Sequence, residues 1–199
     1  TIDNSVINAK HFGIQVCAGS LTVTGDETVV TATGAPQAKT DGDGPIIDGA
    51  AISVVEREGY QDLDAVAIEG GTFKASDASK AVKAYTFNNA DRVEGEWPDA
   101  GSVVAVSGGS FSDPVDEGIC ADGFAPQQNA DGSFGVHEHQ FTISHSDADS
   151  HWAECAICGA VSGKQAHSFT VVQHDGENHW MKCEGCDAVS AKTAHAFTV

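Results

Sequence analysis

The stretch "AIEGGTFKASD" (67–77) is matched 38 residues later by "AVSGGSFSDPV" (105–115), and "CAGSLTV" (17–23) is a weaker third copy with Leu21 in place of the phenylalanine. The shared pattern is apolar-x-Gly-Gly-Ser/Thr-Phe. Glycine accepts the positive φ of a sharp corner, so the pattern predicts a strand, a corner, and a second strand that carries an inward Phe73 or Phe111. Stacked units of this kind are typical of a parallel β-helix, with an antiparallel sandwich as the alternative.

The composition of the 199-residue chain favours an all-β protein, because short runs of Val, Ile, Thr and Phe alternate with Gly, Asn and Asp. The formal net charge of −19, from 29 acidic and 10 basic residues, makes nucleic acid and anionic membranes poor partners. No stretch approaches roughly 18 apolar residues, so we expect no membrane insertion in this segment. The chain starts at Thr1 without Met and stops at a repeat boundary, so we interpret it as a piece of a longer protein.

The segment "GGSFSDPVDEGICADGFAPQQNADGSFGV" (108–136) resembles the closing segment of pectin-lyase-like β-helix repeats in large surface proteins of gut bacteria. The matching residues are Gly108, Gly109, Phe111, Ser112, Asp113, Pro114, Ala121, Gly123, Phe124, Asp131, Gly132, Phe134 and Val136. Cys120 departs from the pattern, which has a larger apolar residue there. The resemblance implies a right-handed parallel β-helix (solenoid) over residues 1–136 and an extracellular, cell-surface location. Asp131-Gly132 predicts a hairpin turn between strands at Phe124 and Phe134, which would cap the solenoid.

Residues 139–166 and 167–194 are two copies of a 28-residue repeat that contains His-Trp-x-x-Cys-x-x-Cys. Identical residues in the first copy are His139, Phe141, Thr142, Asp147, His151, Trp152, Cys155, Cys158, Ala160, Val161, Ser162, Lys164 and Ala166. His195, Phe197 and Thr198 open a third copy. We therefore expect three domains: 1–136, a first repeat at 137–166 and a second at 167–199. Trp152 and Trp180 would be the main apolar bodies, with Phe141, Phe169 and Phe197 beside them.

A Cys-x-x-Cys segment presents two thiolates to one metal ion, and imidazoles can complete a tetrahedral set. Sulfur with nitrogen favours zinc, although the ligand types leave iron open. Each repeat has too few apolar residues to fold unaided, so we expect two structural zinc ions per chain. A redox disulfide and one shared four-cysteine site are the alternatives, whereas haem attachment is excluded because Gly159 and Asp187 follow the second cysteines. Over 139–195 the repeats resemble the zinc-ribbon-like His/Cys repeats of bacterial surface proteins.

The histidine ligands are harder to assign, because His139, His151 and His167 compete for two places beside Cys155 and Cys158. His151 lies four residues before Cys155, which puts both on one face of a strand. We expect His167 to complete the first site. The predicted zinc ligands are His151, Cys155, Cys158 and His167 for one ion, and His179, Cys183, Cys186 and His195 for the other. His139 is then left over, and ligands from upstream remain the alternative.

Other reactive residues stand outside the repeat pattern. His137, His145 and His174 have no histidine at the equivalent position of the other repeat, and we interpret these three and His11 as residues without a metal-binding role. Cys17 and Cys120 lie in apolar stretches, where buried free thiols are favoured over a disulfide. A cluster of acids around Arg57 has too few basic neighbours for an acidic-polysaccharide lyase and is interpreted as a solvated loop; its members are Glu56, Glu58, Asp62 and Asp64.

No catalytic motif is present, so we expect a non-catalytic, stalk-like or adhesin-like segment of an extracellular bacterial surface protein. Its partner would be a host or bacterial surface glycan or protein. The alternatives are a carbohydrate-active or carbohydrate-binding domain on a pectin-lyase-like scaffold, and zinc capture by the repeats.

Overall fold

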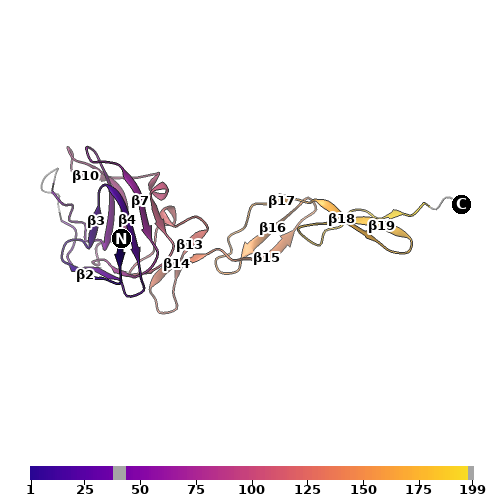
Figure 1. Ribbon diagram of the computed structural model, residues 1–199, viewed down its shortest axis with the longest axis horizontal. Helices are drawn as coiled ribbons and strands as arrows, with labels where there is room; N and C mark the ends of the chain where they lie inside the picture. Colours follow the sequence, from indigo (N-terminus) through magenta and orange to yellow (C-terminus); the bar gives the residue numbers. More distant parts are fainter. Residues whose placement is uncertain (38–43, 197–199) are drawn as a thin grey trace. The chain divides into compact units, whose positions relative to one another are not determined.

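The computed structural model describes residues 1–37 and 44–196, which form two compact units, Thr1–Glu138 and His139–Val199. Every regular element longer than three residues in this part of the chain is a β-strand, which confirms the all-β prediction (Figure 1). Among the described residues, no helix is long and apolar enough to cross a membrane. Phe197 and Thr198, which open the third copy of the repeat, lie outside the described residues.

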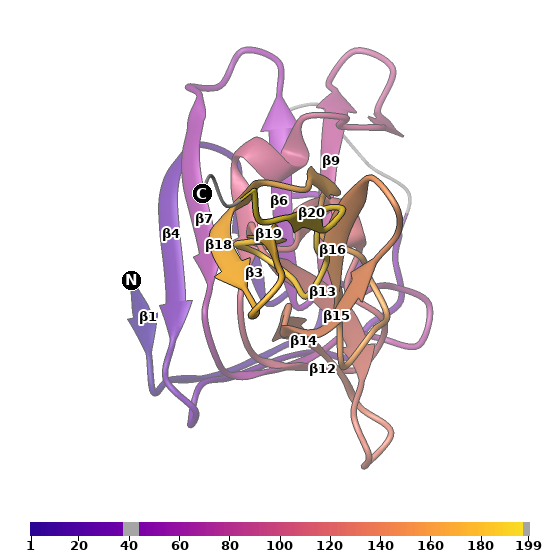
Figure 2. The ribbon, with the colours of Figure 1, turned by 90° about the vertical axis from the view of Figure 1, so that its right-hand side faces the viewer.

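The first unit has three sheets, and over residues 2–88 the chain visits them in turn, so that every third strand returns to the same sheet. The first sheet is wholly parallel and contains β1 (Ile2–Asp3), β4 (Gly19–Thr24), β7 (Leu63–Ile68) and β11 (Val104–Val106). In Figure 2, β1, β4 and β7 lie side by side at the edge of the molecule.

The other two sheets are mixed. The second has parallel β2 (Val6–Ala9), β5 (Val29–Ala32), β8 (Thr72–Lys74) and β12 (Ser110–Phe111), followed by antiparallel β14 (Phe134–Glu138) and β13 (Phe124–Gln128). The third has parallel β3 (Ile14–Val16), β6 (Ile52–Arg57) and β9 (Val82–Asn88), with antiparallel β10 (Val93–Gly95) at its edge. Short 3-10 helices span Ala100–Ser102 (η1) and Glu117–Ile119 (η2). The mixed sheets therefore do not by themselves show the expected parallel β-helix: β13 and β14 form the hairpin that the sequence predicts, but the antiparallel β10 was not predicted.

The two Gly-Gly-Ser/Thr-Phe stretches are equivalent in the structure. Phe73 and Phe111 are paired in register on β8 and β12, are 0% and 1% exposed, and stack with ring centroids 5.1 Å apart. Gly71 and Gly109 turn the chain into these strands at φ values of 107° and 111°, a backbone region that side chains rarely adopt. Stacking of Phe73 on Phe111, as the sequence predicts, places the phenylalanines at the centre of the first unit's core.

The weaker third copy is not equivalent to the other two. Leu21 lies on β4 in the first sheet, whereas Val30 on β5 is the residue paired with Phe73. The loop that precedes β5 has a single glycine, Gly25, rather than Gly-Gly, so the motif gave no signal there.

The predicted closing hairpin is present. β13 and β14 pair antiparallel from Phe124↔Glu138 to Gln128↔Phe134, and β14 also pairs with β12 through Phe111↔Phe134. At the turn, Gly132 has a φ of 87° and the carboxylate of Asp131 accepts the amide N–H of Ser133 at 3.0 Å. The hairpin therefore covers the edge strand β12, which would otherwise expose its backbone groups.

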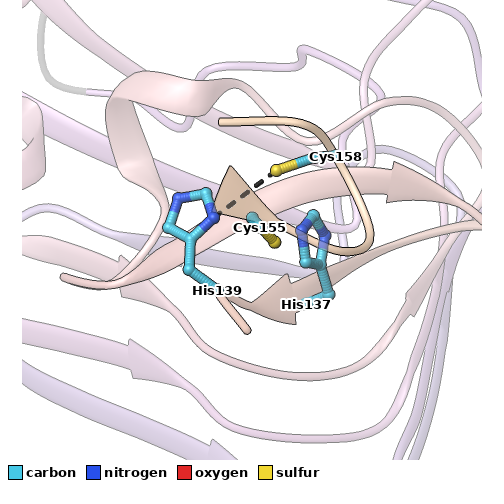
Figure 3. Close-up of side chains that lie close together, drawn as sticks. All are labelled: His137, His139, Cys155 and Cys158. Atoms are coloured by element: carbon cyan, nitrogen blue, oxygen red, sulfur yellow. Dashed lines mark hydrogen bonds between the residues drawn. The ribbon is translucent and has the colours of Figure 1, made fainter. Parts of the chain in front are cut away.

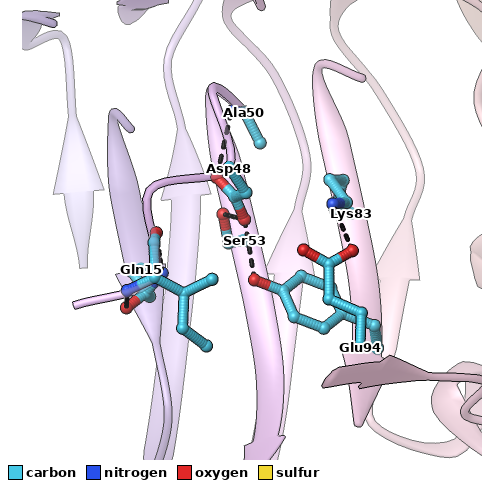
Figure 4. Close-up of polar contacts among 8 residues, drawn as sticks. Gln15, Asp48, Ala50, Ser53, Lys83 and Glu94 are labelled. Atoms are coloured by element: carbon cyan, nitrogen blue, oxygen red, sulfur yellow. Dashed lines mark hydrogen bonds and ion pairs between the residues drawn. The ribbon is translucent and has the colours of Figure 1, made fainter. Parts of the chain in front are cut away.

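One carboxylate is fully buried in the first unit. Asp48 accepts hydrogen bonds from the Ser53 hydroxyl at 2.6 Å, the Tyr85 hydroxyl at 2.8 Å and the Ala50 amide at 3.1 Å (Figure 4). Burial, followed by the Asp48 carboxylate, raises the pKa of Tyr85, so the phenol stays protonated and donates. A buried acid of this kind is tolerated because its oxygens are saturated with donors.

The second unit contains one three-stranded antiparallel sheet per repeat. The first sheet is β15 (Phe141–Ser146), β16 (Ser150–Cys155) and β17 (Gln165–Ala166), and the second is β18 (Phe169–His174), β19 (Asn178–Cys183) and β20 (Thr193–Ala194). Register shifts occur at equivalent places, Phe141/Ile143 and Phe169/Val171. The repeat in the sequence is therefore a repeat in the backbone.

The repeated polar residues hold each sheet together in the same way in both copies. Lys164 pairs with Asp147 at 2.8 Å and lies 4.0 Å from the Trp152 ring centroid. Lys192 pairs with Asp175 at 2.9 Å and lies 4.0 Å from that of Trp180. Phe141 and Phe169 contact the rings of His139 and His167 rather than forming a buried core, and they remain 43% and 37% exposed.

Candidate metal centres

Two groups of two histidines and two cysteines are assembled by the structure. The first contains His137, His139, Cys155 and Cys158, and the second contains His151, His167, Cys183 and Cys186. Within each group the candidate ligand atoms all lie within 4.8 Å of one another. Each group is able to hold a metal ion.

The geometry of the groups fits a tetrahedral ion. Bonds of about 2.3 Å to sulfur and about 2.0–2.1 Å to nitrogen at tetrahedral angles place a sulfur and a nitrogen about 3.6 Å apart. The Cys158 Sγ lies 3.5 Å from the Nδ1 of His139 (Figure 3). In the second group, Cys186 Sγ lies 3.3 Å from His167 Nδ1, and Cys183 Sγ lies 3.9 Å from His151 Nδ1. These separations bracket the expected one.

The pairing of histidines with cysteines differs from the one expected from the sequence. His151 and Cys155 lie on one face of β16, but four residues along a strand separate them by about 13 Å, at about 3.3 Å per residue. One zinc ion cannot bridge that distance. His151 of the first repeat instead joins His167, Cys183 and Cys186 of the second, whereas Cys155 and Cys158 join His139 of their own repeat and His137, which precedes it.

Each repeat therefore has a cysteine end and a histidine end. His151 on β16 lies opposite Gln165 on β17, so its ring stacks with that of His167 at 5.6 Å between centroids. The Cys155–Cys158 segment leaves β16 at the other end. The second metal group forms where the His151–His167 end of the first three-stranded sheet meets the Cys183–Cys186 segment that follows β19 of the second.

Two histidines that were not predicted to be ligands, His137 and His139, belong to the first metal group. His137 is 7% exposed at the end of β14, and His139 follows two residues later. The signal in the sequence was the spacing: His139 precedes Cys158 by 19 residues, and His167 precedes Cys186 by the same number. The second group includes His151, which lies 16 residues before His167. The equivalent position before His139 is Gly123, so the repeat pattern does not mark His137 as a ligand.

The two remaining predicted ligands do not join the groups. His179 and His195 stack on one another at 5.5 Å between ring centroids, and among the described residues they belong to no group of three or more potential ligands. His145 instead pairs with Glu154 at 2.9 Å and stacks on Trp152, and His11 and His174 are exposed.

The environment of the buried cysteines favours the thiolate, which is the form that binds metal. Burial raises the pKa of Cys155, but N–H donors of Cys158, Ile157 and Gln140, together with His139, lower it to about 5. Burial likewise raises the pKa of Cys183, but hydrogen bonds from the Gly185 amide, His167 and the Ser168 amide lower it to about 6.

The backbone also sets the tautomer of His167. Its Nε2 lies 3.0 Å from the carbonyl oxygen of Asp147, which can only accept, so Nε2 carries the proton. The lone pair then resides on Nδ1, the atom that faces Cys186. A ligand imidazole held through its other nitrogen by a carbonyl is the usual arrangement in metal sites.

The two cysteines outside the repeats form no disulfide with each other. Cys17 and Cys120 are free thiols and only partly buried, and burial raises the pKa of both, that of Cys120 to about 11. Both thiols are therefore protonated and weakly reactive at neutral pH.

The acid cluster of the first unit lines a groove rather than standing alone. Glu56, Glu58 and Asp62 border a cavity of about 750 Å³ together with Tyr60 and Trp97. Asp64 lies outside the lining and accepts a hydrogen bond from Ser20 at 3.4 Å. Arg57 also lines the cavity; its side chain is buried, and its guanidinium carbon lies 4.9 Å from the Tyr60 ring centroid and 5.3 Å from that of Phe87.

No protein-family model, curated protein sequence or solved structure matches this chain.

Proposed function

We propose that residues 137–196 bind two zinc ions that take the place of a hydrophobic core, and that the chain is a non-catalytic segment of an extracellular bacterial surface protein. In this proposal the first unit is a right-handed parallel β-helix closed by the β13–β14 hairpin. The repeats follow it along the chain and serve as a stalk-like or adhesin-like segment that presents the protein to a surface glycan or protein.

The observation that carries the zinc assignment is the repeated donor set. Both groups offer two sulfurs and two imidazole nitrogens with S–N separations of 3.3–3.9 Å. Soft thiolates combined with imidazoles in a tetrahedral array select zinc over calcium and magnesium. A structural rather than catalytic role is supported by the full set of four protein ligands, which leaves no position for a water or substrate.

The need for a metal is supported by the packing of the repeats. Of the described hydrophobic residues in 139–196, only Cys155 and Cys183 are buried, while Ile143, Val161 and Val172 are 43–63% exposed. A module of this kind lacks the apolar burial that offsets chain entropy, and bound metal can supply the missing free energy.

The β-helix assignment is supported by the strand order. Successive strands up to β9 belong in turn to the parallel arrays β1-β4-β7, β2-β5-β8 and β3-β6-β9, and after the antiparallel β10, β11 and β12 extend the first two arrays. The surface location is supported by the resemblance of residues 108–136 and of the tandem repeats to segments of bacterial surface proteins.

The zinc proposal is tested by measuring the metal content of the chain and the absorption spectrum of its cobalt-substituted form. The purified chain is expected to contain two zinc ions, with cobalt substitution giving the absorption of tetrahedral S2N2 sites. Purified chain with fewer than two zinc ions, or cobalt spectra without thiolate charge transfer, would contradict the proposal.

A carbohydrate-binding groove is the second candidate function, and the Glu56–Asp62 groove favours it. Tyr60 is 42% exposed and Trp97 lines the same cavity, so aromatic faces and carboxylate acceptors converge there. A glycan screen with Trp97→Ala as the matched variant decides it: a ligand that binds the parent and not the variant establishes the groove, and release of a cleavage product would make the domain an enzyme.

A further inference from the structure

His179 and His195 reproduce the geometry of the histidine pair in the second metal group. Their ring centroids are 5.5 Å apart with an interplanar angle of 14°, compared with 5.6 Å and 23° for His151 and His167. His179 lies opposite Thr193 on β20, as His151 lies opposite Gln165 on β17. The pair is thus the same structural feature, one repeat later.

The contacts that hold the pairs in place are also the same. The His167 amide donates to the carbonyl of Asp149 at 3.1 Å, and the His195 amide donates to the carbonyl of Glu177 at 2.8 Å. Each of these amides is therefore held by the sheet that carries the first histidine of its pair. The histidine end is therefore preorganised for an ion.

We infer that His179 and His195 are the histidine half of a third zinc site, which takes its two thiolates from the Cys-x-x-Cys of a further repeat placed after them. The inference rests on the proposed zinc role of the two complete groups. In the second group the equivalent pair, His151 and His167, receives Cys183 and Cys186 in that manner.

The structure also bears on the sequence of the Cys-x-x-Cys segment that would complete the third site. A Cβ on Gly185 would overlap the Nε2 of His151, so glycine before the second cysteine leaves the space that the His151 ring occupies. The first repeat has Ile157 at that position, and its group contains His137 instead. We therefore expect the segment that completes the third site to be Cys-x-Gly-Cys.

The experiment extends the 199-residue chain by one repeat and counts metal. A copy of residues 168–195 is joined directly after His195, so that its cysteines follow His195 at the spacing by which Cys183 and Cys186 follow His167. The extended chain is expected to bind three zinc ions and the 199-residue chain two. Cobalt-to-thiolate absorption per chain should rise in proportion.

Two variants of the extended chain test the residues. His179→Ala should lower the zinc content from three to two, and so should isoleucine in place of the glycine of the added Cys-Glu-Gly-Cys. An extended chain that stays at two, or a third zinc that survives His179→Ala, overturns the inference. Fewer than two zinc ions in the 199-residue chain would instead contradict the zinc role itself, so the two failures are distinguishable.

Discussion

The Nδ1 of His167 lies 3.3 Å from the Sγ of Cys186, a cysteine of its own repeat 19 residues later, and not beside Cys158 of the repeat before. His139 stands in the same relation to Cys158, at 3.5 Å. The histidine that heads a repeat thus serves the cysteines that follow it, and His151 crosses to the next repeat to join them.

This arrangement predicts which histidines set the metal content. His139→Ala is expected to lower the zinc content from two per chain to one, because it removes a ligand of the first group. His195→Ala should leave two, because His195 belongs to neither complete group. Elemental analysis of the purified variants measures both, and the opposite pattern would restore the pairing expected from the sequence alone.

Gly185→Ala is expected to weaken metal binding at the second group only. The new Cβ would overlap the His151 ring, so the ring has to shift away from Cys183. Competition with a zinc chelator measures the affinity of each site. Gly163→Ala is the matched control in the same unit, since a Cβ there meets nothing within 4 Å.

Metal removal should unfold the repeats and leave the first unit folded. The first unit has a continuous core around Val30, Phe73 and Phe111, whereas the described part of the repeats buries almost no apolar side chain. Treatment with a chelator, followed by heteronuclear NMR, should collapse the dispersion of resonances from 139–196 alone. Retention of that dispersion in metal-free protein would show that zinc is not what holds the repeats.

Acidification should release metal from both groups. The pKa of Cys183 is lowered from 9.0 to about 6 and that of Cys155 to about 5. Because both values lie below the unfolded one, the stabilising thiolate contribution is fully present above pH 9 and is lost as the pH falls through the range from about 6 to about 5. A metal indicator measures the zinc released from the parent chain, and a zinc content that does not fall as the pH is lowered would contradict the prediction.

Phe111→Ala is expected to lower the free energy of unfolding of the first unit by about 3–5 kcal/mol. The ring is 1% exposed and stacks on Phe73, so its removal leaves a cavity bounded by β8, β12 and β14. Urea denaturation measures the change, with Val93→Ala at a 56% exposed position as the control. An effect near that of the control would mean that the Phe111 position is not core.

Local patterns in the sequence determined the strand class, the Phe73–Phe111 stack, the β13–β14 hairpin and the 28-residue repeat. Each depends on residues that are neighbours along the chain or on a period, and glycines with φ above 100° leave a mark that can be read directly. The donor types of the metal groups could likewise be predicted, since thiolates and imidazoles were repeated together.

Tertiary structure alone decided which donors meet. His151 and Cys155 look like partners in the sequence because they are four residues apart, but an extended strand carries them to opposite ends of one sheet. The ligands that meet come from segments 16 and 32 residues apart, His151 with His167 and His151 with Cys183. Such contacts depend on how one sheet follows another. The shared 19-residue spacing marks His139 with Cys158 and His167 with Cys186, but no spacing marks the second histidine of each group. His137 shows the same limit, since only the end of β14 places an imidazole that no repeat pattern marks.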